Sequence, residues 1–279
     1  MGIWAHSSRD AVPCALTALQ LGGNLWLAAT FEERTLPELL VLAPAFVFLF
    51  WYNPIIAIHN FLHTPWFRSG ALNRAYAALN SINLGLPQIL YRHHHLNHHR
   101  YENDRRGPDG RTRDHSSTFA FGRGGRHEGA VAYSALGLFR RGTNEAWREA
   151  LRKGEGRQLA LEFVTALAGL ALLGLLSWRF LVFFYLPVFY AGWFLAHLEN
   201  YYEHYGAAPE RRAANSVSYY GRLYNRLFCN EGYHQEHHLR PQAHWTRRPA
   251  VARELAGELA VPGRTISRWP PLLGFLDRR

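Results

Sequence analysis

Cysteine and methionine are both scarce in this 279-residue chain, which has two cysteines, Cys14 and Cys229, and one methionine. Two thiols are too few for a disulfide scaffold, a thiolate zinc ribbon or a ferredoxin-type iron–sulfur cluster. The sequence also lacks the Cys-x-x-Cys-His pattern that attaches haem and the Gly-x-Gly-x-x-Gly pattern that binds dinucleotides. Any electrons that the protein uses are therefore expected to come from a separate donor.

Apolar residues make up 48% of the chain, which excludes a disordered protein, and they gather in four long runs. About 20 apolar residues in a helix cross the hydrocarbon core of a membrane. The sequence therefore predicts an all-α membrane protein, residues 1–279 forming a single integral-membrane domain with four transmembrane helices in two hairpins. A signal peptide in place of the first run, and a buried soluble hairpin in place of the last two, are the alternatives. The predicted spans are Ala11–Thr30, Leu36–Ile58, Leu159–Ser177 and Phe180–Leu198.

Basic residues predict the orientation of these spans. Residues 91–158 hold 14 basic and 8 acidic residues, and residues 205–279 hold 12 and 6. Basic connections stay on the cytoplasmic side, so we expect both termini and the segment 91–158 to be cytoplasmic. A net charge of +10 divided between two membrane-proximal segments does not favour nucleic-acid binding.

Two shorter segments also have recognisable patterns. Ala71–Leu90 is moderately apolar but interrupted by asparagines and Pro87, which is typical of an interfacial or re-entrant helix. The alternation around Phe119–Phe121, next to a glycine-rich turn, predicts a small β-hairpin.

Histidine is unusually abundant, with 16 residues, and most of them lie in four short segments. His59 and His63 are spaced to share one helix face. The second segment reads either His95-x-x-His98-His99 or His94-x-x-x-His98-His99, and the fourth has His234, His237 and His238. The third contains His204. Unsatisfied histidine is costly to bury, so packing does not explain four such segments, whereas metal binding does. The number of imidazoles is too large for one tetrahedral ion and suits two ions, although imidazole itself serves Zn, Cu, Ni and Fe alike.

These motifs, in this order and separated by paired apolar spans, resemble the membrane-bound fatty acid desaturase and hydroxylase superfamily. Gly232-Tyr-His-Gln-Glu-His-His-Leu239 resembles its third histidine box, and Asn200-Tyr-Tyr-Glu-His-Tyr-Gly206 resembles an extra motif of its alkane hydroxylase branch. The resemblance implies a helical cytoplasmic cap that holds two non-haem iron ions, with O₂ as co-substrate. It implies iron ligands at His59, His63, His98, His99, His204, His234, His237 and His238, together with His95 or His94.

Other polar residues near these motifs are candidates to support the metal. Asn200 lies one helical turn before His204 and could bind an ion directly or through water, and His197 has a structural or supporting role. Uncompensated divalent ions also call for nearby carboxylates that accept ring N–H groups. Glu203, Glu236, Glu199 and Asp104 are the candidates, although Glu199 and Glu203 could equally solvate a helix end.

The resemblance implies removal of hydrogen from an unactivated C–H bond of a fatty acyl or lipid chain. We expect a desaturase, with an alkane or fatty-acid hydroxylase, or a relative that forms terminal alkenes or alkynes, as the alternative. A ferredoxin or reductase would supply electrons, and the basic segment 91–158 could receive such an acidic partner. A histidine-rich metal transporter or storage protein is less favoured, because no histidine lies near the middle of any span.

Overall fold

The computed structural model describes residues 2–140 and 142–277, most of which are helical. The chain divides into two compact units. Unit 1 comprises Met1–His93 with Thr143–Trp193, and unit 2 comprises His94–Gly142 with Phe194–Arg279. Helices α5 (Gln88–Tyr101) and α10 (Leu186–His204) each supply residues to both units.

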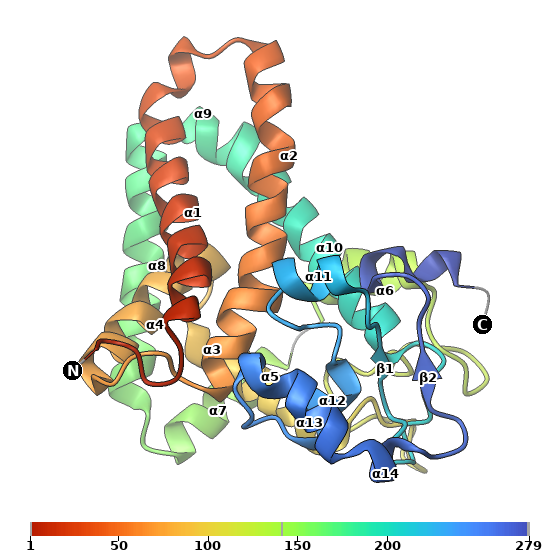
Figure 1. The fold of residues 1–279 in the computed structure, drawn as a ribbon. Helices are drawn as coiled ribbons and strands as arrows, with labels where there is room; N and C mark the ends of the chain where they lie inside the picture. The colour runs from red at the N-terminus through yellow and green to blue at the C-terminus, as the bar shows by residue number, and fades with distance from the viewer. Residues whose placement is uncertain (1, 141, 278–279) are drawn as a thin grey trace. The chain divides into compact units, whose positions relative to one another are not determined.

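Unit 1 is built on long apolar helices, of which α1 (Ala11–Thr30), α2 (Leu36–Tyr52) and α8 (Gly156–Leu176) stand side by side in Figure 1. α2 continues through a π-helical turn (Asn53–Ile58) into α3 (His59–His63). Similarly, α9 (Trp178–Phe180) continues through a second π-helical turn (Leu181–Tyr185) into α10.

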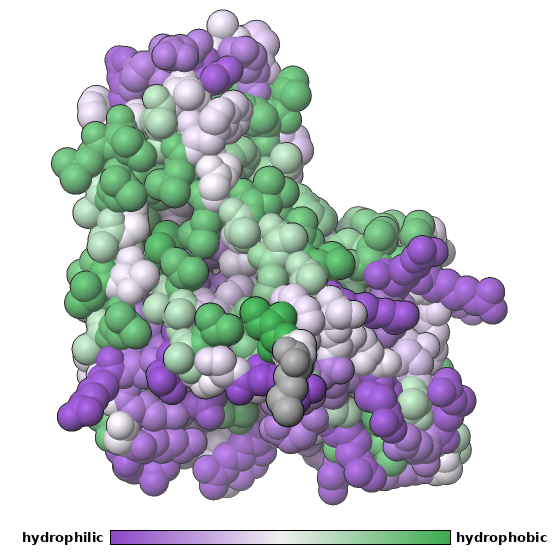
Figure 2. Space-filling view, turned by 60° about the vertical axis from the view of Figure 1, so that its left-hand side comes forward, coloured by the Kyte–Doolittle hydropathy of each residue, from purple (hydrophilic) through white to green (hydrophobic). Residues whose placement is uncertain are grey.

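Four of these stretches are long and apolar enough to cross a membrane: Ser8–Glu33, Leu36–His63, Gly156–Leu176 and Trp178–His204. Figure 2 shows apolar side chains covering the flanks of the long helices and hydrophilic ones at the end where α1 turns into α2. Of the predicted all-α membrane fold, the mostly helical structure and the four candidate spans are confirmed.

The ends of the apolar helices are fixed by polar side chains. Thr35 and Glu38 form a capping box that starts α2, with Thr35 N donating to Glu38 Oε2 over 2.7 Å. Ser177 caps α9, and its hydroxyl also donates to Glu32 over 3.0 Å. Arg179, which the sequence places in a tight bend, pairs with the same carboxylate at 3.0 Å. These polar side chains therefore determine the residues at which the apolar helices begin.

Between the long helices, unit 1 contains α4 (Gly70–Leu84) and, later in the chain, α7 (Thr143–Arg152). α4 has 15 residues, which is too short to cross a membrane. It ends at Gly85, whose φ of +66° glycine adopts without strain. Two of the asparagines that interrupt its apolar pattern are buried and bonded: Asn80 donates to Gln88 Oε1 and Asn83 to the carbonyl of Thr17. They tie α4 into unit 1.

Unit 2 is made of short elements and loops. Its helices beyond α5 and α10 are α6 (Ala130–Gly137), α11 (Arg222–Leu227), α12 (His234–Leu239), α13 (Arg248–Glu254) and α14 (Ala256–Leu259). Short 3₁₀ turns occur at Ser8–Asp10 and Phe31–Glu33 in unit 1 and at Trp245–Arg247 and Pro271–Leu276 in unit 2. Two parallel strands of two residues each, β1 (Val217–Ser218) and β2 (Thr265–Ile266), pair with each other.

The β-hairpin predicted around Phe119–Phe121 is wrong. These residues form consecutive turns, with Ala120 N donating to Ser117 O and Gly122 N to Phe119 O. The backbone N–H and hydroxyl of Thr118 both donate to the side chain of Asn103. Side-chain bonds of this kind compete with strand pairing, which the alternation of apolar residues does not reveal.

His127 in unit 2 gives one pH-dependent prediction. Its ring stacks on Phe119 at 4.1 Å, and burial together with the charge of Arg105 lowers its pKa to about 4. The unfolded chain, with a histidine pKa of about 6.5, therefore binds more protons below pH 6.5, and this residue costs stability as the pH falls from 6.5 towards 4. His127→Gln should lose fewer degrees of melting temperature than the wild type between pH 7 and pH 5. If the melting temperatures of His127→Gln and of the wild type fall by the same amount between pH 7 and pH 5, this assignment is contradicted.

Candidate metal centre

Four buried imidazoles converge in unit 2. They belong to His98 on α5, His204 at the end of α10, and His234 and His238 on α12, and each side chain is at most 5% exposed. Each offers a nitrogen, and these nitrogens all lie within 4.8 Å of one another. Nitrogens that bind one metal ion at about 2 Å lie up to about 4 Å apart, so the group is only slightly wider than a coordination sphere.

The protons on two of these rings can be assigned from their partners. His98 Nδ1 lies 2.8 Å from Asp114 Oδ2, and His204 Nδ1 lies 3.2 Å from the carbonyl oxygen of Asn215. A carboxylate and a carbonyl only accept hydrogen bonds, so both rings donate from Nδ1 and leave Nε2 with a lone pair. The buried His98 Nε2 has no hydrogen-bond partner in the described part of the chain. Both rings are thus prepared to bind a cation through Nε2.

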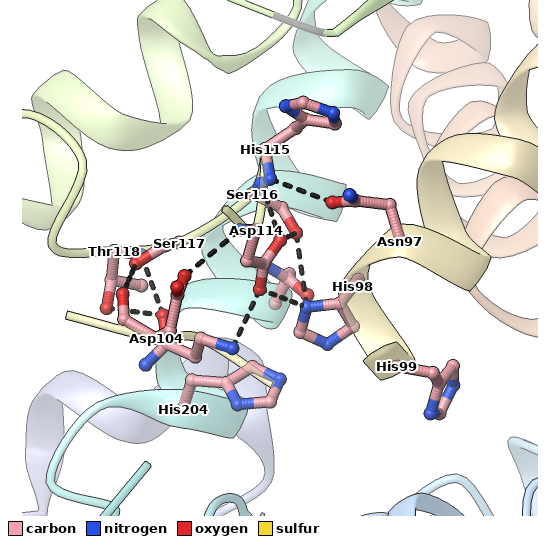
Figure 3. Close-up of polar contacts among 12 residues, drawn as sticks. Asn97, His98, His99, Asp104, Asp114, His115, Ser116, Ser117, Thr118 and His204 are labelled. Carbon is pink, nitrogen blue, oxygen red and sulfur yellow. Dashed lines mark hydrogen bonds and ion pairs between the residues drawn. The ribbon is translucent and has the colours of Figure 1, made fainter. Parts of the chain in front are cut away.

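Asp114 is held by its own network, drawn in Figure 3. It is fully buried and accepts hydrogen bonds from the backbone N–H of Asn103 and from both the N–H and the hydroxyl of Ser116. Burial alone would raise the pKa of Asp114, but His98 and the Ser116 bonds reverse this and hold the pKa well below its usual value. Asp104 accepts from the N–H of Asp114 and so supports the loop.

A second group of imidazoles in unit 2 consists of His95, His99 and His237. His95 and His99 are one turn apart on α5, with their Nε2 atoms 2.9 Å from each other. The ring of His237 lies 4.6 Å from that of His99. In unit 1, His59 and His63 are likewise adjacent on α3, with ring centres 5.4 Å apart. The i, i+4 pairings predicted from the sequence are present on both helices.

Carboxylates surround the outer side of His234. Its Nδ1 lies 3.4 Å from Glu203 Oε1 and 3.7 Å from Glu231 Oε1, and both acids are buried. Arg248, which is 2% exposed, pairs with Glu231 at 2.7 Å. Tyr224 donates its hydroxyl proton to Glu199, so that this acid is engaged with a tyrosine rather than with an imidazole. Glu203 and Glu231 are the acids placed to accept a ring proton from His234.

Glu236 fixes α12 instead of touching an imidazole. Its carboxylate accepts from Ser218, Tyr220 and Arg264, and it is fully buried. The neighbouring Gln235 accepts from the N–H of Ser216 and donates to Asn215. These bonds hold the helix that carries His234, His237 and His238.

Three further residues predicted to belong to the site are His94, His197 and Asn200. They lie at or next to a small cavity of about 30 Å³ in unit 2. His94 and His197 line the cavity, and the ring of His94 stacks on His115 at 6.2 Å. Asn200 donates to the hydroxyl of Tyr133, another lining residue, over 2.6 Å. Of the two candidates in the second histidine segment, His95 therefore lies with His99 and His237, and His94 faces this cavity.

A family model for fatty acid desaturases matches residues 36–269. The chain belongs to the fatty acid desaturase family. It is 30% identical over 224 residues to a sphingolipid delta(4)-desaturase of Schizosaccharomyces pombe, an alignment covering 74% of this chain and 58% of that protein. It is 26% identical over 256 residues to a sphingolipid delta(4)-desaturase DES1-like protein of Oryza sativa subsp. japonica, covering 90% of this chain and 74% of that protein. The aligned chain thus spans only part of each relative.

Fatty acid desaturases generally depend on two iron ions, and the residues of unit 2 fit a metal of this kind. The donors are neutral imidazoles, which suit iron, and His98 presents a buried nitrogen without a hydrogen-bond partner in the described residues. The acids around His234 supply negative charge close to the rings. The arrangement can therefore hold a cation and partly neutralise it.

Sequence reasoning missed several residues of this site, Asp114, Glu231 and Arg248 among them. Asp114 follows His98 by 16 residues in a loop of turns, with no periodic spacing that connects the two. Glu231 does lie three residues before His234, and that proximity was a usable signal. The other two become visible only when the chain is folded.

Asp114→Asn tests the support of His98. The variant keeps the size of the side chain but removes the negative charge that holds the Nδ1 proton of His98. Loss of such a partner typically weakens metal binding by about 10- to 100-fold. Iron titration of the purified protein should show this decrease, whereas Asp109→Asn, in an exposed turn, should leave it unchanged. Equal iron affinity in the two variants would remove Asp114 from the site.

Proposed function

We propose that the chain is an O₂-dependent di-iron desaturase that introduces a double bond into the acyl chain of a lipid. The observation that carries this proposal is the buried group of His98, His204, His234 and His238, with Asp114 behind it. Membership of the desaturase family and the sphingolipid desaturase relatives support it. When bound, the two irons would supply the activation of O₂ needed to break an unactivated C–H bond.

We further propose how the ligands are divided. His98, His204, His234 and His238 would hold one iron, and His95, His99 and His237 would be ligands of the other. His59 and His63, the adjacent pair on α3, would also be iron ligands, as the family resemblance implies. Asp114, Glu203 and Glu231 would keep the ring protons on the outward nitrogens, and thereby keep the inward nitrogens available.

The reaction balances with an external electron donor. The acyl chain loses two hydrogen atoms, and these, with two electrons and two protons from the donor, reduce O₂ to two molecules of water. Both relatives are named as sphingolipid desaturases, which favours a membrane lipid over a free alkane as substrate of this chain. A lipid of this class would reach the site from the bilayer.

The sequence-based topology belongs to the same proposal. A single integral-membrane domain with two helical hairpins, a cytoplasmic helical cap, and both termini on the cytoplasmic side would place the histidines where a soluble donor can reach them. The excess of basic residues in 91–158 and 205–279 supports this orientation.

Docking of the donor gives a prediction about salt. If an acidic ferredoxin or reductase docks on the basic segment 91–158, its charges are screened as ionic strength rises. Donor-supported turnover should then fall several-fold between low and high salt, mainly through a higher KM for the donor. A KM that does not change with salt would exclude this docking mode.

The proposed activity is tested by lipid profiling after expression in a host that lacks the protein. We expect new lipids that are lighter than their precursors by two hydrogen atoms, together with about two irons per purified chain. Lipids heavier by one oxygen atom would indicate a hydroxylase instead. Zinc without iron, with an unchanged lipid profile, would favour metal storage or transport.

A further inference from the structure

Unit 1 contains a cavity of about 570 Å³ that opens to the surface. Its walls come from α3, α4, α5 and the start of α8, together with the short turn that precedes α8. The walls are held together by polar bonds, since Gln158 on α8 donates to the carbonyl of Arg74 on α4 and Glu162 accepts from the N–H of Ile89 on α5. These hydrogen bonds fix the positions of the helices that form the walls of the cavity.

One side of this cavity is positively charged. Arg74, Arg92 and Arg157 line it, with Glu155 and Glu162. Glu155 is engaged by Arg92 at 2.8 Å and by His93 at 2.6 Å. Glu162 accepts from the N–H of Ile89 and from Gln158.

Arg74 and Arg157 remain exposed and make no ion pair within residues 2–140 and 142–277. Both carboxylates of the cavity therefore have other partners, and two guanidinium groups are available to an anionic ligand.

The other side is apolar and continues into a candidate membrane span. Phe61, Leu62, Ile89 and Leu161 line the cavity. Leu161 lies on α8 and is 48% exposed, and Val164, one turn further along the same helix, is 62% exposed. A ligand with an anionic head and a hydrocarbon chain would satisfy both sides, because its chain could follow α8 into the bilayer.

Neither histidine of α3, His59 or His63, is among the residues that line the cavity. Phe61 follows His59 by two residues, a rotation of about 200° around a helix, so the two side chains leave α3 on opposite sides. A lipid in this cavity would contact α3 through Phe61, on the side away from His59, and through Leu62.

We propose that this cavity binds the phosphate head group of an anionic membrane phospholipid, which is not the lipid that reacts. Arg74 and Arg157 bind the phosphate, and the apolar wall receives the first part of a chain. Basic pockets between membrane helices are typical sites for such head groups. The bound lipid would hold α4 and α8 together behind α3.

Native mass spectrometry of the detergent-purified protein, titrated with phosphatidylglycerol, tests the proposal. The double variant Arg74→Gln/Arg157→Gln should bind the lipid about tenfold or more weakly, given the contribution of each basic residue near a lipid surface. Leu161→Trp, which fills the apolar side and keeps both charges, should also weaken binding. Arg148→Gln/Arg226→Gln removes the same charge from exposed positions outside the cavity and should bind as the wild type does.

Two further measurements separate the possible ligands. Phosphatidylcholine, which has no net charge, should bind more weakly than phosphatidylglycerol, and millimolar inorganic phosphate should not displace the lipid. Displacement by phosphate alone would assign the site to a free anion and overturn the proposal. Equal phosphatidylglycerol binding by Arg74→Gln/Arg157→Gln and by the wild type would also overturn it. Because the readout is lipid retention, either result leaves the proposed desaturase activity untouched.

Discussion

Replacing His98 by alanine is expected to abolish double-bond formation and to lower the bound iron below two per chain. The ring of His98 lies 4.6 Å from that of His204 and 5.1 Å from that of His238, and Asp114 fixes its proton. His98 supplies one of the four nitrogens of this group, and the other three come from His204 on α10 and from His234 and His238 on α12. Lipid profiling and metal analysis of the same preparation measure both effects.

His94→Ala is the matched control for this variant. It lies on the same helix, four residues earlier, and its ring faces the small cavity with His115 instead of the group of His98. We expect His94→Ala to keep the iron content and most of the activity. If the desaturated product persists in His98→Ala, or if His94→Ala loses iron to the same degree, the proposed division of the ligands is wrong.

The four apolar helices could be predicted from the sequence because their signal is local. Each run of about 20 apolar residues determines its own helix, and a side chain such as Thr35 or Ser177 sets where the helix begins. The i, i+4 histidine pairs are local in the same sense, since helical spacing alone brings His59 next to His63 and His95 next to His99.

Glu203 was predicted to lie beside an imidazole, and it does lie 3.4 Å from His234 Nδ1. The rest of the support could not be predicted in this way, because it depends on contacts between segments distant in sequence. Nothing before folding links His98 to Asp114, or His204 to the carbonyl of Asn215. The choice between His94 and His95 has the same origin, since both spacings in the sequence are compatible with a helix and only the surrounding loops distinguish them. The turns at Thr118 likewise depend on Asn103, which lies 15 residues earlier.

Buried charge around α12 connects the site to the stability of unit 2. Glu203 and Glu231 are acids close to His234, and each is at most 3% exposed. Two acids in such a position repel each other and lose hydration, so a buried cation is needed beside them. Arg248 on α13 is that cation, and it also lies 3.2 Å from His237 Nδ1. The helix that follows the fourth histidine segment thus carries the counter-charge for the site.

Arg248→Met is therefore expected to destabilise the protein strongly. The variant keeps much of the side-chain volume but leaves the buried Glu231 carboxylate without its partner at 2.7 Å. Breaking a buried pair from one side costs about 3–5 kcal/mol, which corresponds to a fall in melting temperature on the order of 10 °C. Thermal unfolding of the metal-free protein measures this effect without any contribution from bound iron.

Arg247→Met provides the control at the adjacent residue. Arg247 pairs with Glu254 at 3.2 Å, but the two side chains are 66% and 59% exposed, so the variant should change stability by less than about 0.5 kcal/mol. The double variant Arg248→Met/Glu231→Gln removes both buried charges and should be more stable than Arg248→Met alone, because the uncompensated carboxylate is gone. If the loss of unfolding free energy in the double variant instead equals the sum of the losses in the two single variants, Arg248 acts through packing. The counter-charge role assigned to it would then be wrong.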